Sequence, residues 1–434
     1  MRKLTKATNV SRILQNGPAV LAVGLVSLQG SHLAADDLAV RAEKLHRDAI
    51  VVDTHQDVPW TLLKKWVDLA TPGATPHVDI PRLHAGGVTA PFFSVYLPTA
   101  SEKAGTAAKE TLEVIDVVDR VVASHPEILV GATSVAEIRA AKKAGKIAIL
   151  KGLEGGHALE NSLARLRMFG RLGIRYMTLT HTDSTAWADS SGPFWEHDWS
   201  PKKSAVHGGL TAFGKRVVLE MNRIGIAVDV SHVSDDVLAQ TLLVSRAPVF
   251  ASHSSCRALA DMPRNLTDAQ IRAIAARGGV VMINVGSGFI DQGAYDAMRR
   301  FSVSIGPRVE ALRATYASEP QKLAQESEAL WKDFKPVRAP FTKVVDHVEH
   351  VMKIAPGAAG IGSDFDGVED VPDGFEDVSR FPRITEELLR RGHSEAEVRG
   401  VLGENFLRFL SRIEETAASL AHEPPDATPF PAKR

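Results

Sequence analysis

Histidine and carboxylate side chains follow short apolar runs throughout this sequence. The run IVVDTHQD carries His55 and Asp57, and the run IAILKGLEGG carries Glu154. Other apolar runs end in or near four more residues of these types: His181, His232, His253 and Asp364. Such side chains bind divalent metal ions or transfer protons. Their repeated position after an apolar run indicates one site that is assembled from the whole chain.

Five of these residues form a set that could bind two metal ions. His55 and Asp57 are two positions apart, so their side chains fall on the same side of a strand. One metal could bind His55, Asp57 and Glu154. A second could bind Glu154, His232 and His253, because the two oxygens of Glu154 can bridge two ions. Each metal would keep open positions for water, which is typical of catalytic zinc. Such a site activates a bridging hydroxide as a nucleophile and polarises a carbonyl or phosphoryl oxygen.

The sequence also offers groups for proton transfer and substrate binding. Asp364 in GIGSDFDG is the candidate proton carrier, and Asp366, two residues further on, is its rival. A carboxylate near a metal-bound water can accept its proton and pass it to a leaving amine. His181 could donate a hydrogen bond to an oxyanion as it forms. Arg257 or Arg264 could bind a substrate carboxylate through two parallel hydrogen bonds.

The apolar runs predict the strands of a parallel α/β fold. These strands lie near residues 49–55, 88–96, 147–153, 174–180, 226–231, 248–252, 279–285 and 359–363. Amphipathic stretches such as 106–123 and 233–244 separate them, and Thr267 before DAQI predicts another helix start. Eight such units suit a closed (β/α)8 barrel (a TIM barrel), which gathers the C-terminal ends of its strands on one face. An open doubly wound sheet is the alternative, although no GxGxxG motif follows the first strand.

Several segments depart from this alternation. Residues 183–209 are polar, aromatic and glycine-rich, and could form a loop over the site. Residues 290–340 are a long insertion between strands seven and eight, with a charged helical stretch around 307–334. The insertion could be a lid, an oligomer contact or a solvated helix. We expect one catalytic domain over 36–415, followed by a proline-rich disordered tail over 416–434.

Composition and the N-terminal segment limit the function and the location. The net charge of −1 argues against nucleic acid or an anionic membrane as the main partner. The single cysteine, Cys256, rules out an intramolecular disulfide and a CxxC motif. Residues 1–35 combine a basic start with a short apolar stretch and SHLAA, a pattern typical of a signal peptide. We therefore expect export to the periplasm or secretion, without a stable membrane anchor after processing.

The motifs together resemble one known family. DTHQD, the run EGGHALENSLARLRMFGRLGIRYMTLTHTDSTAWAD, VDVSH, ASHSS and GIGSDFDGV are similar to the membrane (renal) dipeptidases, zinc peptidases of the amidohydrolase superfamily. The motifs occur in the family's order between about 50 and 375. The resemblance implies an amidohydrolase-like (β/α)8 barrel, commonly in a homodimer. It also implies two zinc ions bridged by Glu154, with the ligand sets given above.

The resemblance further implies roles for individual residues. His181 matches the histidine that contacts substrate and stabilises the tetrahedral intermediate, and Arg264 matches the arginine that binds the C-terminal carboxylate of the dipeptide. Asp364 matches the acid/base aspartate. Where the mammalian members carry a pocket tyrosine, this chain has Phe289, which puts its substrate preference in question. The chain also has neither an apolar C-terminal tail nor the disulfide cysteines of those members, and so resembles a bacterial exported member.

The leading hypothesis is zinc-dependent hydrolysis of dipeptides, including those with a C-terminal D-residue, by a metal-bridging hydroxide. The first alternative is a related amidohydrolase that acts on N-acyl amino acids, lactams or lactones, because one barrel supports many chemistries through its loops. The second is an exported binding protein that holds metal without turnover.

Overall fold

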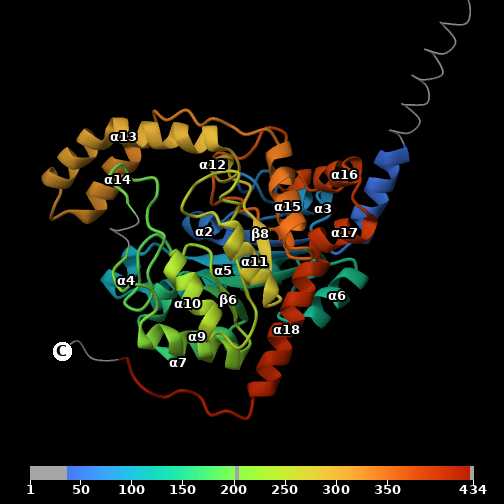
Figure 1. The fold of residues 1–434 in the computed structure, drawn as a ribbon, viewed down its shortest axis with the longest axis horizontal. Coiled ribbons are helices and arrows are strands. Elements are labelled where there is room, and N and C mark those ends of the chain that lie inside the picture. The colour runs from blue at the N-terminus through green and yellow to red at the C-terminus, as the bar shows by residue number, and fades with distance from the viewer. Residues whose placement is uncertain (1–36, 201–204, 431–434) are drawn as a thin grey trace, which may run out of the picture.

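The computed structural model describes residues 37–200 and 205–430. The expected signal peptide at 1–35 therefore lies outside the described residues. Helices surround a central set of strands (Figure 1). Within the described ranges, none of the helices combines the length and the apolar character that a membrane crossing requires.

A curled parallel sheet forms the centre of the molecule. β1, β2, β4, β5, β6 and β7 pair in this order, and β8 pairs with β9, all of them parallel. Parallel bridges from Ala251 to Val281 and from Gln56 to Phe365 link the two sets of strands at both edges. The strands are β1 (Val52–Gln56), β2 (Ala90–Tyr96), β4 (Ile147–Glu154), β5 (Ile174–Thr178), β6 (Ala227–Asp229), β7 (Val249–Phe250), β8 (Val281–Ile283) and β9 (Ala359–Ile361).

These strands form because their side chains are buried on both faces, as expected for parallel strands covered by helices. Glu154 at the end of β4 is level with Tyr96 of β2 and Thr178 of β5, so neighbouring strands finish at the same edge. The surrounding helices are α2 (Val58–Lys64), α3 (Ile80–Ala85), α4 (Ala100–Ala104), α5 (Ala107–Ser124), α6 (Val135–Lys143), α7 (Leu163–Arg171), α9 (Ala212–Ile224), α10 (Asp235–Val244), α11 (Asp268–Ala276), α15 (Thr342–Ile354), α16 (Pro382–Arg390), α17 (Glu395–Arg399) and α18 (Asn405–Leu420).

The local signals in the sequence have clear structural counterparts. Thr267 caps α11 through a capping box with Gln270, which confirms the predicted helix start. Gly225 ends α9 in the left-handed region, with φ of 76°, where a side chain would be strained. The short strand β3 (Leu129–Gly131), which pairs with β4, was absent from our prediction. Its length of three residues gives too little pattern to separate it from a loop.

Helices fill the segment between β8 and β9. α12 (Ser287–Ile290), α13 (Gln292–Thr315) and α14 (Pro320–Trp331) lie there. α13 begins well before the charged stretch that we expected to be helical, and it continues through Pro307. In Figure 1, α13 and α14 extend to one side of the molecule, and the green loop that follows β5 rises toward them.

The end of the chain differs from the expected disordered tail. α18 continues to Leu420, which is buried. Beyond it, Asp426 accepts hydrogen bonds from Arg216 at 2.6 and 2.9 Å, and Phe430 packs edge-on against Phe213 at 4.8 Å between ring centroids. An ion pair and an aromatic contact with α9 therefore hold a segment whose composition predicts disorder.

Candidate metal centre

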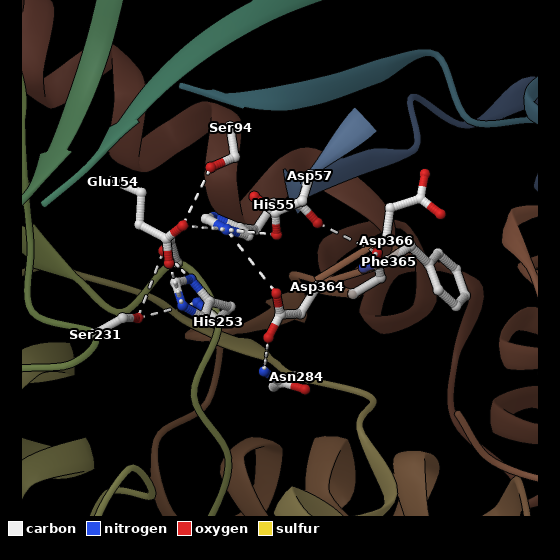
Figure 2. Close-up of polar contacts among 12 residues, drawn as sticks. His55, Asp57, Ser94, Glu154, Ser231, His253, Asn284, Asp364, Phe365 and Asp366 are labelled. Carbon is white, nitrogen blue, oxygen red and sulfur yellow. Dashed lines mark hydrogen bonds and ion pairs between the residues drawn. The ribbon is translucent and has the colours of Figure 1, made fainter. Parts of the chain in front are cut away.

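Side chains from the ends of four strands, β1, β4, β7 and β9, meet at one point of the structure. Figure 2 shows the carboxylates of Asp57, Glu154 and Asp364 directed toward the same region, beside the rings of His55 and His253. All five side chains are buried. The arrangement follows from the parallel sheet, because parallel strands present their C-terminal ends at one edge. The structure thus brings together residues that are far apart in the sequence.

Glu154 lies between two sets of histidines. Its Oε2 atom is 3.5 Å from Nε2 of His55 and accepts a hydrogen bond from Ser94. Its Oε1 atom is 3.1 Å from Nε2 of His232 and 3.4 Å from Nε2 of His253. The two oxygens of one carboxylate therefore face different ligand sets, as a bridging ligand between two cations would.

The hydrogen bonds around His55 leave its Nε2 atom for a cation. The hydroxyl of Tyr176 donates to the Thr54 carbonyl at 3.1 Å, so it accepts from Nδ1 of His55 at 2.8 Å. Nε2 then points at Asp57 Oδ2, 3.5 Å away, and has no hydrogen-bond partner among the described residues. Only a positive charge, carried by a proton or a metal ion, suits a ring nitrogen between two carboxylates.

A second network fixes His253 in the same way. The hydroxyl of Ser252 donates to Asp229 at 2.6 Å and so accepts from Nδ1 of His253 at 2.7 Å. Nε2 of His253 therefore carries a lone pair and faces Nε2 of His232 at 2.9 Å. Carboxylate-anchored histidines with one free nitrogen are typical metal ligands. The donor set of neutral imidazoles and carboxylates fits a zinc-type cation.

The electrostatics of the centre favour an ionised Glu154, neutral His232 and His253, and a positive charge at His55. Burial alone would raise the pKa of Glu154, but His55 and His181 outweigh it and lower the pKa well below its usual range. Burial, assisted by neighbouring positive charge, lowers the pKa of both His232 and His253. Burial opposes a charged His55 ring, yet its acidic neighbours raise its pKa well above the usual value. A positive charge is therefore stabilised at this point of the site.

Asp364 lies beside the metal-binding candidates, whereas Asp366 points away from them (Figure 2). Asp364 Oδ1 is 3.9 Å from Nε2 of His55, and Oδ2 accepts a hydrogen bond from Asn284 at 2.7 Å. Burial, and then the charges of Asp57 and Glu154, raise the pKa of Asp364 well above its usual value. Asp366 instead accepts hydrogen bonds from Thr75 and from the backbone of His77. Its carboxylate is thereby committed to holding two loops together.

The remaining candidates flank the centre. His181 stacks on His232, with ring centroids 4.3 Å apart, and its Nε2 is 3.5 Å from Glu154. Arg264 is 4% exposed and donates to Ser254 and to the His253 carbonyl at 3.2 and 3.4 Å. Its Nε–H has no hydrogen-bond partner in the described part of the chain. Phe289 lies against this guanidinium, 5.4 Å from the ring centroid.

Arg257 and the buried pair of His347 and Cys256 serve the scaffold instead. Arg257 pairs with Asp235 through two hydrogen bonds of 2.9 Å at the surface, so it is already occupied. Nδ1 of the buried His347 accepts from the backbone of Cys256 at 3.0 Å, and its Nε2 contacts the Ile290 carbonyl at 3.1 Å. Cys256 is itself buried.

A cavity of about 610 Å³ opens above the centre, within the range usual for small-molecule sites. Its lining includes Asp57, Glu154, His181, His232, Arg264 and Asp364, together with aromatic side chains. Sequence reasoning missed the residues that orient the ligands, namely Tyr176, Asp229, Ser252 and Asn284. Asp229 had a usable signal, because it is a charged residue inside the apolar run IAVDVSH.

A ring nitrogen without a partner among the described residues, carboxylates on either side of it and a buried acid at the floor of a cavity are the parts of metal-assisted hydrolysis. Fold and site together define a metal-dependent hydrolase of the parallel α/β class. The chain matches the model of the membrane dipeptidase family (peptidase family M19) over residues 39–424. The protein therefore belongs to the membrane dipeptidase family and is a metal-dependent dipeptidase.

Individual relatives agree with this assignment. Dipeptidase 3 of Rattus norvegicus is 35% identical over 403 residues, which are 92% of this chain and 72% of that relative. Human dipeptidase 3 (Homo sapiens) is 33% identical over 404 residues, 91% of this chain and 71% of the relative. The crystal structure of the probable dipeptidase PvdM from Pseudomonas aeruginosa is similar with a TM-score of 0.72 and 26% identity, covering 88% of this chain and 100% of that one.

A further solved structure shares the fold. The metallo peptidase from Rhodobacter sphaeroides, liganded with a phosphinate mimic of the dipeptide L-Ala-D-Ala, has a TM-score of 0.68 and 23% identity. The similarity covers 84% of this chain and 99% of that chain.

Proposed function

We propose that this dipeptidase binds two zinc ions and cleaves dipeptides with a free amine and a free carboxylate, including those with a C-terminal D-residue. The observation that carries the proposal is the position of Glu154, whose Oε2 faces His55 while its Oε1 faces His232 and His253. The phosphinate mimic of L-Ala-D-Ala held by the Rhodobacter sphaeroides peptidase supports the tolerance for a D-residue.

The residues present fit two metal ions. His55, Asp57 and Glu154 would hold one ion, and Glu154, His232 and His253 would hold the other. When bound, such ions lower the pKa of water and polarise a carbonyl oxygen. Nε2 of His55 supports this assignment, because it lies between two carboxylates and has no hydrogen-bond partner among the described residues. The Nε2 atoms of His232 and His253 face each other and Glu154, so a cation could take the place of the hydrogen bond between them.

The other side chains would handle substrate and protons. Arg264 would bind the C-terminal carboxylate, since it lines the cavity and its Nε–H has no hydrogen-bond partner among the described residues. His181 would donate a hydrogen bond to the carbonyl oxygen as negative charge develops on it. Asp364 would hold a proton and pass it to the departing amine, and its raised pKa suits that task.

We further infer that the strands close into a complete (β/α)8 barrel with α12, α13 and α14 as an insertion before the last strand. The bridges from Ala251 to Val281 and from Gln56 to Phe365 support closure. We also propose export, on the basic and apolar character of residues 1–35, and a homodimer, on family resemblance. Cell fractionation and light scattering of the purified protein would test these two points.

The deciding experiment measures amine release from L,L and L,D dipeptides by the mature protein, with zinc and after chelation. We expect zinc-restorable cleavage of free dipeptides, and no cleavage when either terminus is blocked. Cleavage of N-acyl amino acids, lactams or lactones by the fully loaded protein, without cleavage of dipeptides, would overturn the proposed function.

A further inference from the structure

One side of the active-site cavity is apolar, in contrast to its polar floor. We call this side the apolar wall and define it by Phe194, Trp195, Met262, Phe289 and Met298, all of which line the cavity. Most of the wall belongs to a small hydrophobic cluster that is separate from the main core. Because a separate cluster adds little to the barrel itself, its position at the cavity needs its own explanation.

The apolar wall comes from segments outside the curled sheet. Phe194 and Trp195 belong to the loop after β5, and Met298 belongs to α13. Phe194 packs edge-on against Phe289, with ring centroids 6.1 Å apart, and contacts Tyr295 of α13 at 6.3 Å. The loop and the insertion thus meet directly over the site.

Polar contacts hold these two segments in register. Arg299 of α13 donates to the carbonyls of Phe194 and Glu196 at 2.8 and 2.5 Å, and Ser302 donates to the carbonyl of Trp195. Arg313 adds an ion pair with Glu196 at 2.9 Å. One helix therefore holds three successive backbone carbonyls of the loop, and these contacts fix the position of Phe194 and Trp195 in the apolar wall.

The wall lies beside the group that would bind the substrate carboxylate. The Arg264 guanidinium is 5.4 Å from the ring centroid of Phe289, and it follows β7. The aromatic pair Trp60 and Tyr96 lines another part of the cavity. Trp60 belongs to α2 and Tyr96 to β2, and the strands β4, β5 and β6 lie between β2 and β7 in the sheet. With its carboxylate on Arg264, a dipeptide would place its C-terminal side chain next to the apolar wall.

We infer that the apolar wall is a specificity subsite for a bulky apolar side chain on the C-terminal residue of the dipeptide. The inference rests on the proposed function, in particular on the orientation set by Arg264. An apolar pocket favours such substrates because it removes their side chains from water, and the cavity of about 610 Å³ has room for them. Phe289 offers no hydroxyl, so this side chain adds no polar contact that would compete.

The test compares kcat/KM of the zinc-loaded protein for L-Ala-Gly, L-Ala-L-Ala, L-Ala-L-Leu and L-Ala-L-Phe. We expect kcat/KM to rise about tenfold or more from the alanine to the leucine or phenylalanine substrate, the size usual for a filled apolar pocket. A matched series with the variable residue at the N-terminus controls for general hydrophobicity. It reports on the Trp60 and Tyr96 side instead.

Variants locate the effect. Met298→Ala and Phe194→Ala should bring the phenylalanine-to-alanine ratio of kcat/KM close to one for the C-terminal series only. Val303→Ala on the same helix, whose side chain is 57% exposed, should leave the ratio unchanged. Melting temperatures show whether each variant is folded. If Phe194→Ala does not fold, Met298→Ala still tests the inference, because Met298 is only partly buried.

The outcomes separate the two proposals. Cleavage of dipeptides with a flat C-terminal series, or variants that alter only the N-terminal series, would overturn the subsite. Absence of cleavage of every dipeptide by metal-loaded protein would instead overturn the proposed function.

Discussion

At the scale of single residues, the candidate centre depends on hydrogen bonds that select one form of each histidine. The hydroxyl of Tyr176 donates its proton to the Thr54 carbonyl, and the hydroxyl of Ser252 donates its proton to Asp229. Each hydroxyl can therefore only accept a hydrogen bond from the adjacent imidazole. The ring nitrogens aimed at Glu154 are thereby kept free of that tautomeric proton. Outer groups of this kind raise metal affinity although they never touch the metal.

Replacing Tyr176 by phenylalanine tests this role. The variant keeps the buried ring but removes the acceptor for Nδ1 of His55, so we expect zinc affinity to fall about 10- to 100-fold. Competition with a chelator measures the affinity. Tyr295→Phe on α13 is the matched control, and equal zinc affinity in both variants would contradict the role of Tyr176.

Asp364 and Glu154 should differ in what their loss removes. We expect Asp364→Asn to retain both metal ions but to lose about 10²- to 10⁴-fold in kcat, the usual contribution of a general acid/base. Glu154→Ala should lose metal and activity together. Metal analysis and steady-state kinetics on the same preparations distinguish the two, and an active Asp364→Asn enzyme would exclude the proton-carrier role. Asp366→Asn serves as the comparison, because the carboxylate of Asp366 accepts a hydrogen bond from Thr75 and points away from the centre.

At the scale of elements, the sequence predicted the alternation of strands and helices and the residues at the strand ends. The alternation of apolar runs with amphipathic stretches carries this information, because such patterns are local. The conformations that aim the side chains are not local. His232 and Asp364 adopt left-handed backbone, with φ of 66° and 63°, which costs about 1–3 kcal/mol and depends on the surrounding contacts.

The same distinction explains the other differences. The residues alone could not decide whether Arg264 or Arg257 binds the substrate carboxylate. Only the fold shows that Arg257 is paired with Asp235. The early start of α13 was missed since its first half, around Tyr295 and Met298, is held by contacts with the loop after β5 rather than by its own charge pattern. Tertiary contacts decided each of these points.

The capping box of α11 gives an element-scale prediction. Thr267→Ala removes the side-chain acceptor for the backbone of Gln270, so we expect the free energy of unfolding to fall by about 1 kcal/mol. Urea unfolding monitored by circular dichroism measures it. Thr315→Ala, at the exposed end of α13, should lower the free energy of unfolding far less. A loss of equal size in Thr315→Ala would argue against a capping effect in α11.

At the scale of the whole molecule, buried neutral histidines link stability to pH. Burial lowers the pKa of His77 and His347 from 6.5 to about 4. In His347, Nδ1 accepts from Cys256 N, so a proton there would break this bond. Since the folded pKa is lowered, each histidine contributes full stability above about pH 6.5, and this stability is lost as the pH falls toward 4.

Unfolding free energies measured in urea between pH 7.5 and 5 should therefore decrease, by up to about 1.4 kcal/mol per pH unit for each such histidine. His347→Gln cannot take up this proton and should show a shallower dependence than the parent protein. Identical pH slopes for the two proteins would show that His347 does not contribute.

The contact between β1 and β9 also has a consequence for the order of folding. The carboxylate of Asp53 accepts hydrogen bonds from the backbone and hydroxyl of Ser363, which is 310 positions away. Closing so long a stretch of chain is slow, since its entropy must be lost before the contact forms. His55 and Asp57 stand at one end of this stretch and Asp364 at the other. The proposed metal ligands of β1 and the proposed proton carrier therefore come together only when the first and last strands meet, so catalytic activity can appear only after the last strand has been synthesised and has joined the sheet.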